Sequence, residues 1–415
     1  MASGLLFSAI IPVFNKWELT RACLESLRRT TPGVDFEVVV VDNASCDATA
    51  TDCLPLGQAL FPGRFRYLRF DSNRNFGPAC NAGARAAASP LLFFLNNDTL
   101  LEPGWLPPLL HELDSDARTG AVGPLLCYPH DPQLGVRVQH LGIAVGPQLY
   151  PSHLYEYFPA GHPLVHKRRN VQALTAAALM LPRQLFFDCD GFFEEYRNGG
   201  EDIELGLRVG KMGFRQCCVP ESRITHLVGQ TPGRHDHEAH NGQVLKARCF
   251  SLLVPDLALH AASDGYELRL TSMLLPYFAL PQRREQMLGR RLAEGLDAAS
   301  CAELLQREPL WLAGYAHLAR LLESEGDVPG ACSQRFLQSR FRPDVQGMSE
   351  LARLARLCGD DKRQAMAESW LAWRQEAAAS ASLPAAADEV ARYMEALGQA
   401  DVAALYRNWR PGQTT

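Results

Sequence analysis

Two amides and a carboxylate stand side by side at the end of an apolar run. The run LLFFL covers residues 91–95, and Asn96, Asn97 and Asp98 follow it directly. Asn and Asp are common in turns, so a turn alone would explain them. The carboxylate could also bind Mg²⁺ or Mn²⁺, because these ions prefer oxygen ligands and often bridge to the phosphates of a ligand. The neighbouring elements decide between these interpretations.

Polar clusters also follow the preceding strands of the chain. Apolar runs predict strands at 5–14, 36–42, 64–70 and 91–95, and the segments between them predict helices at 16–29, 47–60 and 77–88. This alternation is typical of a parallel sheet with right-handed crossovers. The segments PVFN (12–15), VDNAS (41–45) and SNRNFG (72–77) then join NND at the carboxyl ends of the strands, where open α/β sheets bind ligands.

The residue types favour a nucleotide diphosphate with a metal ion. The chain has no GxGxxG and no Walker A motif, and GLRVGKM (206–212) is one residue too short and has Met in place of Ser or Thr. Asp42, Asn43 and Ser45 could bind the edge of a base and a ribose. Asp98 is suited to a divalent cation.

The second half of the chain changes character. TAAALMLPRQLF (175–186) predicts a strand that enters a short helix, and Glu201 and Asp202 open a helix over 199–215. Carboxylates at a helix start also complement the macrodipole, so from this segment alone a structural role is as good an explanation as catalysis. From about 256 the periodicity is helical to the end. LARLLESEGD (318–327) matches LARLARLCGD (351–360) at an offset of 33, which indicates a tetratricopeptide-like array.

Length and composition argue against several classes of function. At 415 residues we expect two or three domains. The formal charge of −5 and the pI of about 6.2 argue against a nucleic-acid binder. No apolar run approaches the ~20 residues that cross a bilayer. The apolar run at 5–11 has no basic residue before it, so we interpret it as a first strand and not as a signal peptide. Twelve cysteines without a CxxC pair favour reduced thiols in the cytoplasm.

Taken together, the ordered segments resemble the inverting GT-A glycosyltransferases of family 2, especially the rhamnosyltransferase-like branch. The matching segments are IIPVFNKWELTRACLESL, VVVVDNASCDAT, NRNFGPACNAG, LLFFLNNDTLLEPGW, LTAAALMLPR, GFFEEYRNGGEDIELGLR and ITHLVGQT. The predicted organisation is a mostly parallel α/β GT-A domain at 1–255, a helical connector at 256–300 and an all-α, tetratricopeptide-like domain at 301–415.

The resemblance implies a role for each matching residue. The nucleotide-binding residues would be Pro12, Phe14, Asn15, Asp42, Asn43, Ser45, Asn75 and Asn97. Asp98 and His226 would bind Mn²⁺ or Mg²⁺. Asp202 would be the catalytic base, supported by Glu201. The reaction would move a sugar from a UDP- or dTDP-sugar, with rhamnose favoured, to a hydroxyl of a glycan or protein acceptor.

Two features depart from the family pattern or add to it. NND carries one carboxylate where the DxD motif has two, so either the affinity for the metal ion would be modest or the ion would arrive mainly with the donor. The segment RHDHEAHN (234–241) groups His235, His237 and His240. A surface loop that gates the active site is favoured there over a metal site.

Other functions are considered beside this one. A nucleotidyltransferase would need a Gly-rich, basic loop after the first strand, and PVFNKWE has none. A non-catalytic scaffold would be marked by loss of Asp98 or Asp202, and both are present. The helical region could recruit a protein acceptor, since such arrays offer concave surfaces, or it could form a homodimer. We expect a cytoplasmic protein, with peripheral association at the inner face of the membrane kept open.

Overall fold

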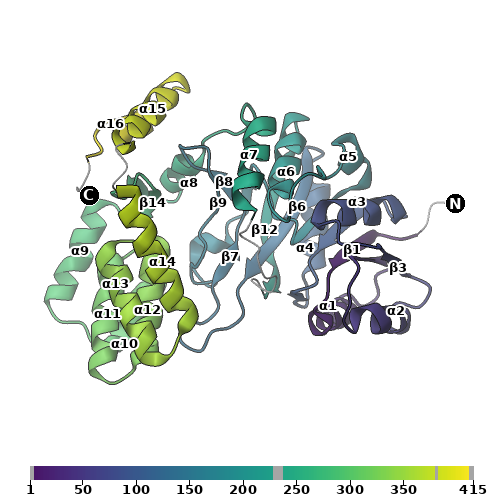
Figure 1. The fold of residues 1–415 in the computed structure, drawn as a ribbon, viewed down its shortest axis with the longest axis horizontal. Helices are drawn as coiled ribbons and strands as arrows, with labels where there is room; N and C mark the ends of the chain where they lie inside the picture. Colours follow the sequence, from purple (N-terminus) through teal and green to yellow (C-terminus); the bar gives the residue numbers. More distant parts are fainter. Residues whose placement is uncertain (1–3, 228–236, 379–381, 411–415) are drawn as a thin grey trace.

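The computed structural model describes residues 4–227, 237–378 and 382–410. An α/β domain carries the N-terminus, and an array of helices forms the opposite end of the molecule (Figure 1). The predicted fold class, a mostly parallel α/β domain followed by an all-α region, is confirmed.

The first half of the sheet follows the predicted alternation. Its strands are β1 (Phe7–Val13), β2 (Glu37–Asp42), β3 (Phe65–Arg69) and β4 (Leu91–Leu95), and its helices are α1 (Trp17–Thr30), α2 (Thr49–Leu60) and α3 (Phe76–Ala86). The pairs β1–β2, β2–β3 and β1–β4 are all parallel. β1 and β2 are buried along their whole length, as expected for strands covered on both faces. The polar clusters at 12–15, 41–45, 72–77 and 96–98 therefore meet at one edge.

The second half completes a mixed sheet of ten strands in the order β10-β12-β6-β11-β4-β1-β2-β3, with β5 and β7 attached at the side. Its strands are β5 (Thr99–Leu101), β6 (Thr119–Cys127), β7 (Val138–His140), β10 (Arg169–Val171), β11 (Ala178–Pro182) and β12 (Arg215–His226). A separate hairpin joins β8 (Ile143–Val145) to β9 (Pro151–His153). β11 runs antiparallel to β4 and β6. β12 pairs parallel with β6 and antiparallel with β5.

Helices cover both faces of this sheet. Residues of α1 and α4 (Leu106–Ser115) share one core with the strands, and residues of α3, α5 (Arg183–Asp188) and α6 (Glu201–Lys211) share the other. The segment that follows contains α7 (Glu238–Cys249) and α8 (Leu257–Ser263). No helix of the described residues is long and apolar enough to span a membrane.

The C-terminal region is a run of helices that pack on their neighbours in sequence. They are α9 (Gln282–Ala293), α10 (Ala298–Arg307), α11 (Leu312–Ser324), α12 (Val328–Phe341), α13 (Val345–Cys358), α14 (Asp361–Ala378), α15 (Leu383–Ala396) and α16 (Ala400–Arg407). A shift of 33 residues along the sequence aligns α11 with α13, and the equivalent residues Leu318 and Leu351 are both buried. The tetratricopeptide-like assignment and the domain boundaries stay predictions.

The prediction of continuous helix from 256 is wrong for one stretch. Residues 267–279 form a hairpin of β13 (Glu267–Leu270) and β14 (Pro276–Ala279). The sequence ELRL alternates in polarity, and the turn that follows contains Leu274 at a φ of +61°. The period of two in this short run was hidden by the helical composition on both sides of it.

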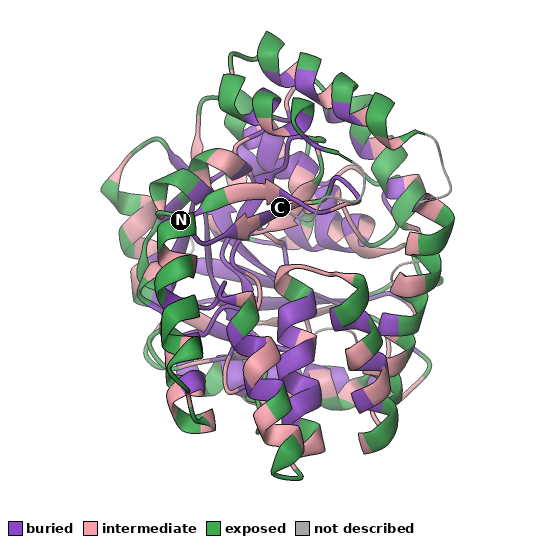
Figure 2. Ribbon diagram, turned by 90° about the vertical axis from the view of Figure 1, so that its left-hand side faces the viewer, coloured by how far each residue is buried: buried purple, intermediate pink, exposed green. Residues whose placement is uncertain are grey.

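The helical region and the α/β domain share one apolar core. Phe158, from the α/β side, packs against Tyr266 and Phe341 with ring centroids 6.2 and 5.7 Å away. The helices of this end are buried on one side and exposed on the other (Figure 2). His162 adds a polar link, because its Nδ1 accepts the Leu164 amide at 3.2 Å and its Nε2–H therefore donates to the Arg307 carbonyl at 3.2 Å.

This link makes stability depend on pH. Burial lowers the pKa of His162, so the unfolded chain binds a proton at about pH 6.5 while the folded chain does not. Stability therefore rises with pH in this range, and acidification below about 6.5 removes at most about 1.4 kcal/mol per pH unit for this group. We expect the free energy of unfolding to fall less between pH 7 and 5.5 in His162→Gln than in wild type, measured by urea titration. Equal losses in both proteins would contradict this account.

Candidate active site

A cavity of about 350 Å³ opens at the carboxyl edge of β1 and β4. Seven of the predicted site residues line it: Pro12, Phe14, Asn43, Asn97, Asp98, Glu201 and Asp202. The sequence prediction missed further lining residues: Val13, Lys16, Leu19, Asn73, Phe76, Asn96, Thr175, Ala176, Ala177, Asn198 and Gly199. The polar ends of the strands thus converge on one cavity.

The loops after β1 and β2 are tied to each other behind the cavity. The Asn15 amide donates to Ser45 Oγ at 2.8 Å, and Asn15 Oδ1 accepts the Cys46 amide at 2.8 Å. Asn43 donates through its side chain to the Asn75 carbonyl at 3.3 Å. Asn15, Ser45 and Asn75 do not themselves line the cavity, and their positions suit them to holding its wall in place.

Asp42 is buried at the end of β2. Its Oδ1 accepts the Ser45 amide at 2.8 Å, and its Oδ2 accepts from Tyr67 at 2.5 Å and from Arg69 at 2.6 Å. Both oxygens are therefore occupied by the protein. The predicted contact of Asp42 with a base stays a prediction, and the geometry gives the residue the role of an anchor for the 43–45 loop.

The two predicted metal ligands lie side by side. Asp98 Oδ1 is 3.1 Å from His226 Nε2, and both side chains are largely buried. The pairing of β5 with β12 sets His226 opposite Thr99, and the Leu227 amide donates to the Asp98 carbonyl at 2.8 Å. Two residues 128 positions apart in the sequence thus form one pair.

Gln139 holds the imidazole of His226. The Gln139 Oε1 atom is 3.3 Å from His226 Nδ1, and on the other side of the ring His226 Nε2–H donates to the Asp98 carboxylate, which can only accept, at 3.1 Å. In histidines that bind a metal through one ring nitrogen, a hydrogen bond at the other ring nitrogen fixes the tautomer. Gln139 lies on the three-residue strand β7 within a loop-rich segment, and no sequence motif marks it.

A pair of histidines, His140 and His153, supports the wall of the cavity at Thr175. The Thr175 amide donates to His140 Nε2 at 3.3 Å, so His140 carries its proton on Nδ1, which faces His153 Nδ1 at 3.0 Å. Burial holds the pKa of His140 well below its usual value, and the neighbouring rings of His153 and His226 act in the same direction. His140 is therefore neutral and serves the architecture of the cavity.

Asp202 and Glu201 open α6 on the opposite wall. Asp202 Oδ2 accepts the Ala176 amide at 3.1 Å, and the side chain is partly exposed to the cavity. Glu201 is buried, and its Oε2 accepts the Gly199 amide at 2.7 Å. Gly200 precedes them at a φ of +100°, where a Cβ would meet the Tyr196 ring at 2.8 Å, so only glycine suits this turn.

The predicted histidine cluster is only partly within the described residues. His235 lies outside them. His237 precedes α7, and His240 Nε2 donates to the Glu195 carbonyl at 3.1 Å. Within residues 4–227, 237–378 and 382–410, no group of three or more His, Cys, Asp or Glu side chains could hold a metal ion.

Comparisons with known proteins agree with this geometry. The family described as glycosyl transferase family 2 matches residues 8–180. The O-antigen biosynthesis protein RfbC of Myxococcus xanthus is 32% identical over 225 residues, which are 53% of this chain and 17% of that protein. The N-acetylglucosaminyl-diphospho-decaprenol L-rhamnosyltransferase of Mycobacterium tuberculosis is 27% identical over 214 residues, which cover 48% of this chain and 68% of the relative.

Among solved structures, GalNAc-T7 with UDP, GalNAc and Mn²⁺ aligns with a TM-score of 0.46 and 18% identity, over 54% of this chain and 44% of that one. The family match begins on β1 and ends on β11, so it contains the four strand ends that build the cavity and both Asn97 and Asp98. Residues 8–180 are therefore similar to glycosyl transferase family 2 domains.

Proposed function

We propose that the protein is a metal-dependent, inverting glycosyltransferase. It moves a sugar from a UDP- or dTDP-sugar, with rhamnose as the favoured candidate, to a hydroxyl of a glycan or protein acceptor. The observation that carries the proposal is that Asp98 and Asp202 line one cavity at the carboxyl edge of the sheet, with His226 in contact with Asp98. The family match and the relatives named above support the same class of reaction.

The cavity suits the nucleotide part of a donor. Phe14 is 45% exposed at its mouth and offers an aromatic face to a base. The amides of Asn43 and Asn97 supply hydrogen-bonding groups on the neighbouring wall. The volume of 350 Å³ lies within the ~300–1,000 Å³ that small-molecule sites occupy.

A divalent cation fits between Asp98 and His226. His226 Nε2 and the Asp98 carboxylate are 3.1 Å apart, and if the imidazole carries its proton on Nδ1, beside Gln139, a cation would take the place of the Nε2 proton between them. Ligands about 2.1 Å from Mg²⁺ in octahedral geometry stand about 3 Å apart on adjacent vertices. The protein supplies two ligands, and the donor diphosphate and water would complete the set. When bound, the ion acts as a Lewis acid that stabilises the charge of the departing nucleoside diphosphate.

Asp202 is placed to act as the base. It faces the cavity at the start of α6, where its oxygens accept the Ala176 amide at 3.1 Å and the Ile203 amide at 2.9 Å. A single carboxylate that takes the proton of the acceptor hydroxyl is what a direct, inverting displacement needs. Glu201 acts through the backbone, because its bond to the Gly199 amide fixes the turn that presents Asp202.

The separate roles of Asp98 and Asp202 can be tested by calorimetry and kinetics. We expect UDP or dTDP to bind in the presence of Mn²⁺ and to bind at least about tenfold more weakly with chelator or in Asp98→Ala, because the diphosphate loses its shared ion. Asp202→Asn should keep the affinity for the nucleotide and lose about 10²–10⁴-fold in kcat. Asp401→Ala, at an exposed position on α16, is the control. If no nucleotide binds to the folded protein, the non-catalytic scaffold becomes the better description.

Gln139 offers a test of the metal site itself. Gln139→Ala frees the His226 ring, so we expect the affinity for Mn²⁺ in the presence of UDP to fall by about 10–100-fold. Titration of free Mn²⁺ by electron paramagnetic resonance measures this. Gln346→Ala, exposed on α13, should match wild type. An unchanged affinity in Gln139→Ala would mean that His226 does not bind the ion.

A further inference from the structure

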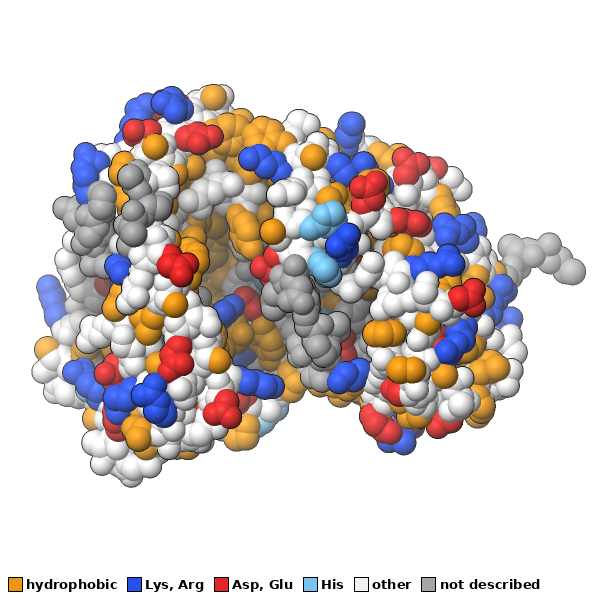
Figure 3. Space-filling model, in the orientation of Figure 1, with side chains coloured by type: hydrophobic (Ala, Val, Ile, Leu, Met, Phe, Trp, Pro, Cys, Tyr) orange, Lys and Arg blue, Asp and Glu red, His pale blue; other side chains and the backbone are white. Residues whose placement is uncertain are grey.

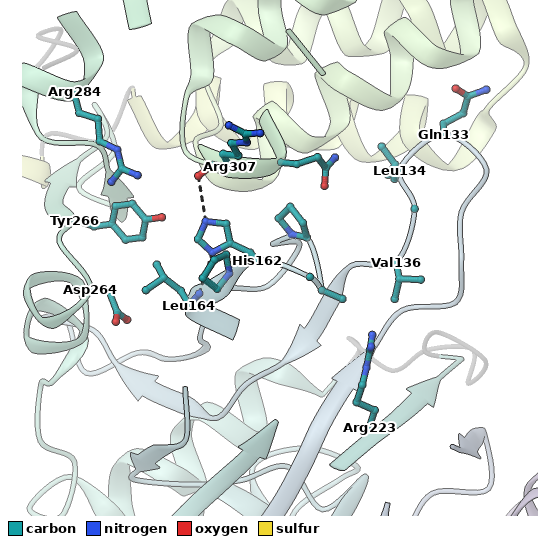
Figure 4. Close-up of a pocket in the computed structure, with 16 residues that line it drawn as sticks. Gln133, Leu134, Val136, His162, Leu164, Arg223, Asp264, Tyr266, Arg284 and Arg307 are labelled. Atoms are coloured by element: carbon teal, nitrogen blue, oxygen red, sulfur yellow. Dashed lines mark hydrogen bonds between the residues drawn. The ribbon is translucent and has the colours of Figure 1, made fainter. Parts of the chain in front are cut away.

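A second and larger cavity lies between the α/β domain and the helical region. Its volume is about 860 Å³ (Figure 4). The α/β side supplies residues 133–136, residues 159–164 and Arg223, and the other walls come from Asp264, Tyr266, Arg284, Gln306 and Arg307. The surface is visibly hollowed between these two parts of the molecule (Figure 3). The helical region thus supplies part of the wall of this cavity.

Most charges of this cavity are already paired. Arg284 binds Glu308 with a closest distance of 2.7 Å. Asp264 accepts from Lys167 at 2.9 Å and from Arg169 at 2.6 Å, so one carboxylate faces two cations. Lys167 and Arg169 do not line the cavity, but beside its wall they leave one positive charge that Asp264 does not balance.

Arg223 adds to this surplus. Its guanidinium contacts the Cys127 thiol at 3.7 Å, and no carboxylate of the described part of the chain lies within 4.0 Å of it. Its Nε atom is buried and has no hydrogen-bond partner there. A partly buried arginine without a carboxylate partner has the N–H donors of its planar guanidinium available for a carboxylate or a phosphate.

The remaining walls suit a sugar. Leu134 and Val136 offer apolar surface on one side of the cavity, and Leu164 and the Tyr266 ring stand on the other (Figure 4). The Tyr266 hydroxyl is buried and has no hydrogen-bond partner among the described residues. A sugar presents both apolar C–H faces and hydroxyls, so it matches such a mixed lining better than a purely apolar ligand does.

Two segments run from this cavity to the candidate active site. Arg223 precedes His226 by three residues on β12, and Val136 precedes Gln139 by three residues at β7. At ~3.3 Å per residue, each cavity residue lies about 10 Å along the strand from its active-site neighbour. A ligand of a few sugar units could therefore occupy the cavity and reach toward the donor site.

We propose that this cavity binds the acceptor, and that the acceptor is a glycan carrying an oxyanion, a phosphate or a carboxylate, which Arg223 binds. The inference rests on the proposed function, because it assigns the acceptor class of that same reaction. It also gives the helical region a role, since Arg284, Gln306 and Arg307 complete the walls.

The test is ligand-observed NMR on the full chain with three probes: glucose 1-phosphate, glucuronic acid and the neutral methyl glucoside. Wild type should bind at least one anionic probe more tightly than methyl glucoside. Arg223→Gln should weaken that binding at least about tenfold, since the bidentate charged contact is lost. Arg223→Lys should be intermediate, because it keeps the charge without the planar fork. Arg291→Gln, which removes an exposed arginine of α9, should bind as wild type does.

The outcomes separate this inference from the proposed function. Saturating UDP or dTDP with Mn²⁺ should leave the anionic probe bound, and displacement would place the probe in the donor site and overturn the proposal. Equal binding by Arg223→Gln and Arg291→Gln, or no binding of either anionic probe to folded wild type, would overturn it as well. A preference for glucose 1-phosphate over glucuronic acid identifies a phosphate-bearing acceptor, and the reverse identifies an acidic glycan. Nucleotide binding is read independently, so its failure would reject the transferase assignment while the cavity result stands.

Discussion

The contact between Asp98 and His226 is the constraint on which the candidate active site depends. A carboxylate and an imidazole lone pair 3.1 Å apart repel each other unless a proton or a cation lies between them. The protein holds them there through the backbone, since the β5–β12 ladder sets Thr99 opposite His226 and the Leu227 amide binds the Asp98 carbonyl. The sheet therefore holds the two side chains in contact, with the Nε2 proton of His226 between them, and a bound divalent ion would take the place of that proton.

The backbone around the same cavity is held in sparsely populated conformations. Asn15, Lys16, Ala44, Asn75 and Asn198 all have φ between 55° and 69°. For residues with a Cβ, such conformations cost on the order of 1–3 kcal/mol each and persist only where the surroundings over-determine them. Here the Ser45 hydroxyl and the Asp42 carboxylate hold the loops on either side of Ala44. Strain gathered at one edge of a sheet is typical of a site that orders its groups before a ligand arrives.

The sequence predicted well where regular periodicity and strand ends carried the information. The four parallel strands and the meeting of their polar ends follow from alternating strands and helices, so Asn43, Asn97 and Asp98 could be assigned to one cavity. Gln139 and the wall at Thr175 could not, because Gln139 lies on a three-residue strand, Thr175 lies in the loop before β11, and the partners of both are far apart in the chain. The hairpin at 267–279 was missed because its four-residue strands lie within a strongly helical composition.

The proposed acceptor cavity could not be predicted from the sequence, for a related reason. Its walls come from several separate segments, and what marks Arg223 is the absence of a described carboxylate partner, which no local pattern predicts. Such a feature becomes visible when every charge around a cavity is matched with its partner in three dimensions. Charges that have a partner can then be set aside, and Arg223 remains as the candidate for ligand binding.

The shared core also bears on how the helical region can be studied. Phe158 of the α/β domain packs on Phe341 of α12, and Tyr315 and Leu337 belong to the same buried cluster as Phe94 of the sheet. Removing residues 301–415 would expose this apolar surface, and exposure of a fully buried aromatic or aliphatic side chain costs about 1.5–3 kcal/mol each. Several such losses approach the whole stability of a domain. A truncated protein that fails to transfer sugar would therefore be uninformative, and the role of the helical region is better resolved by single substitutions in the cavity walls, which leave the core intact.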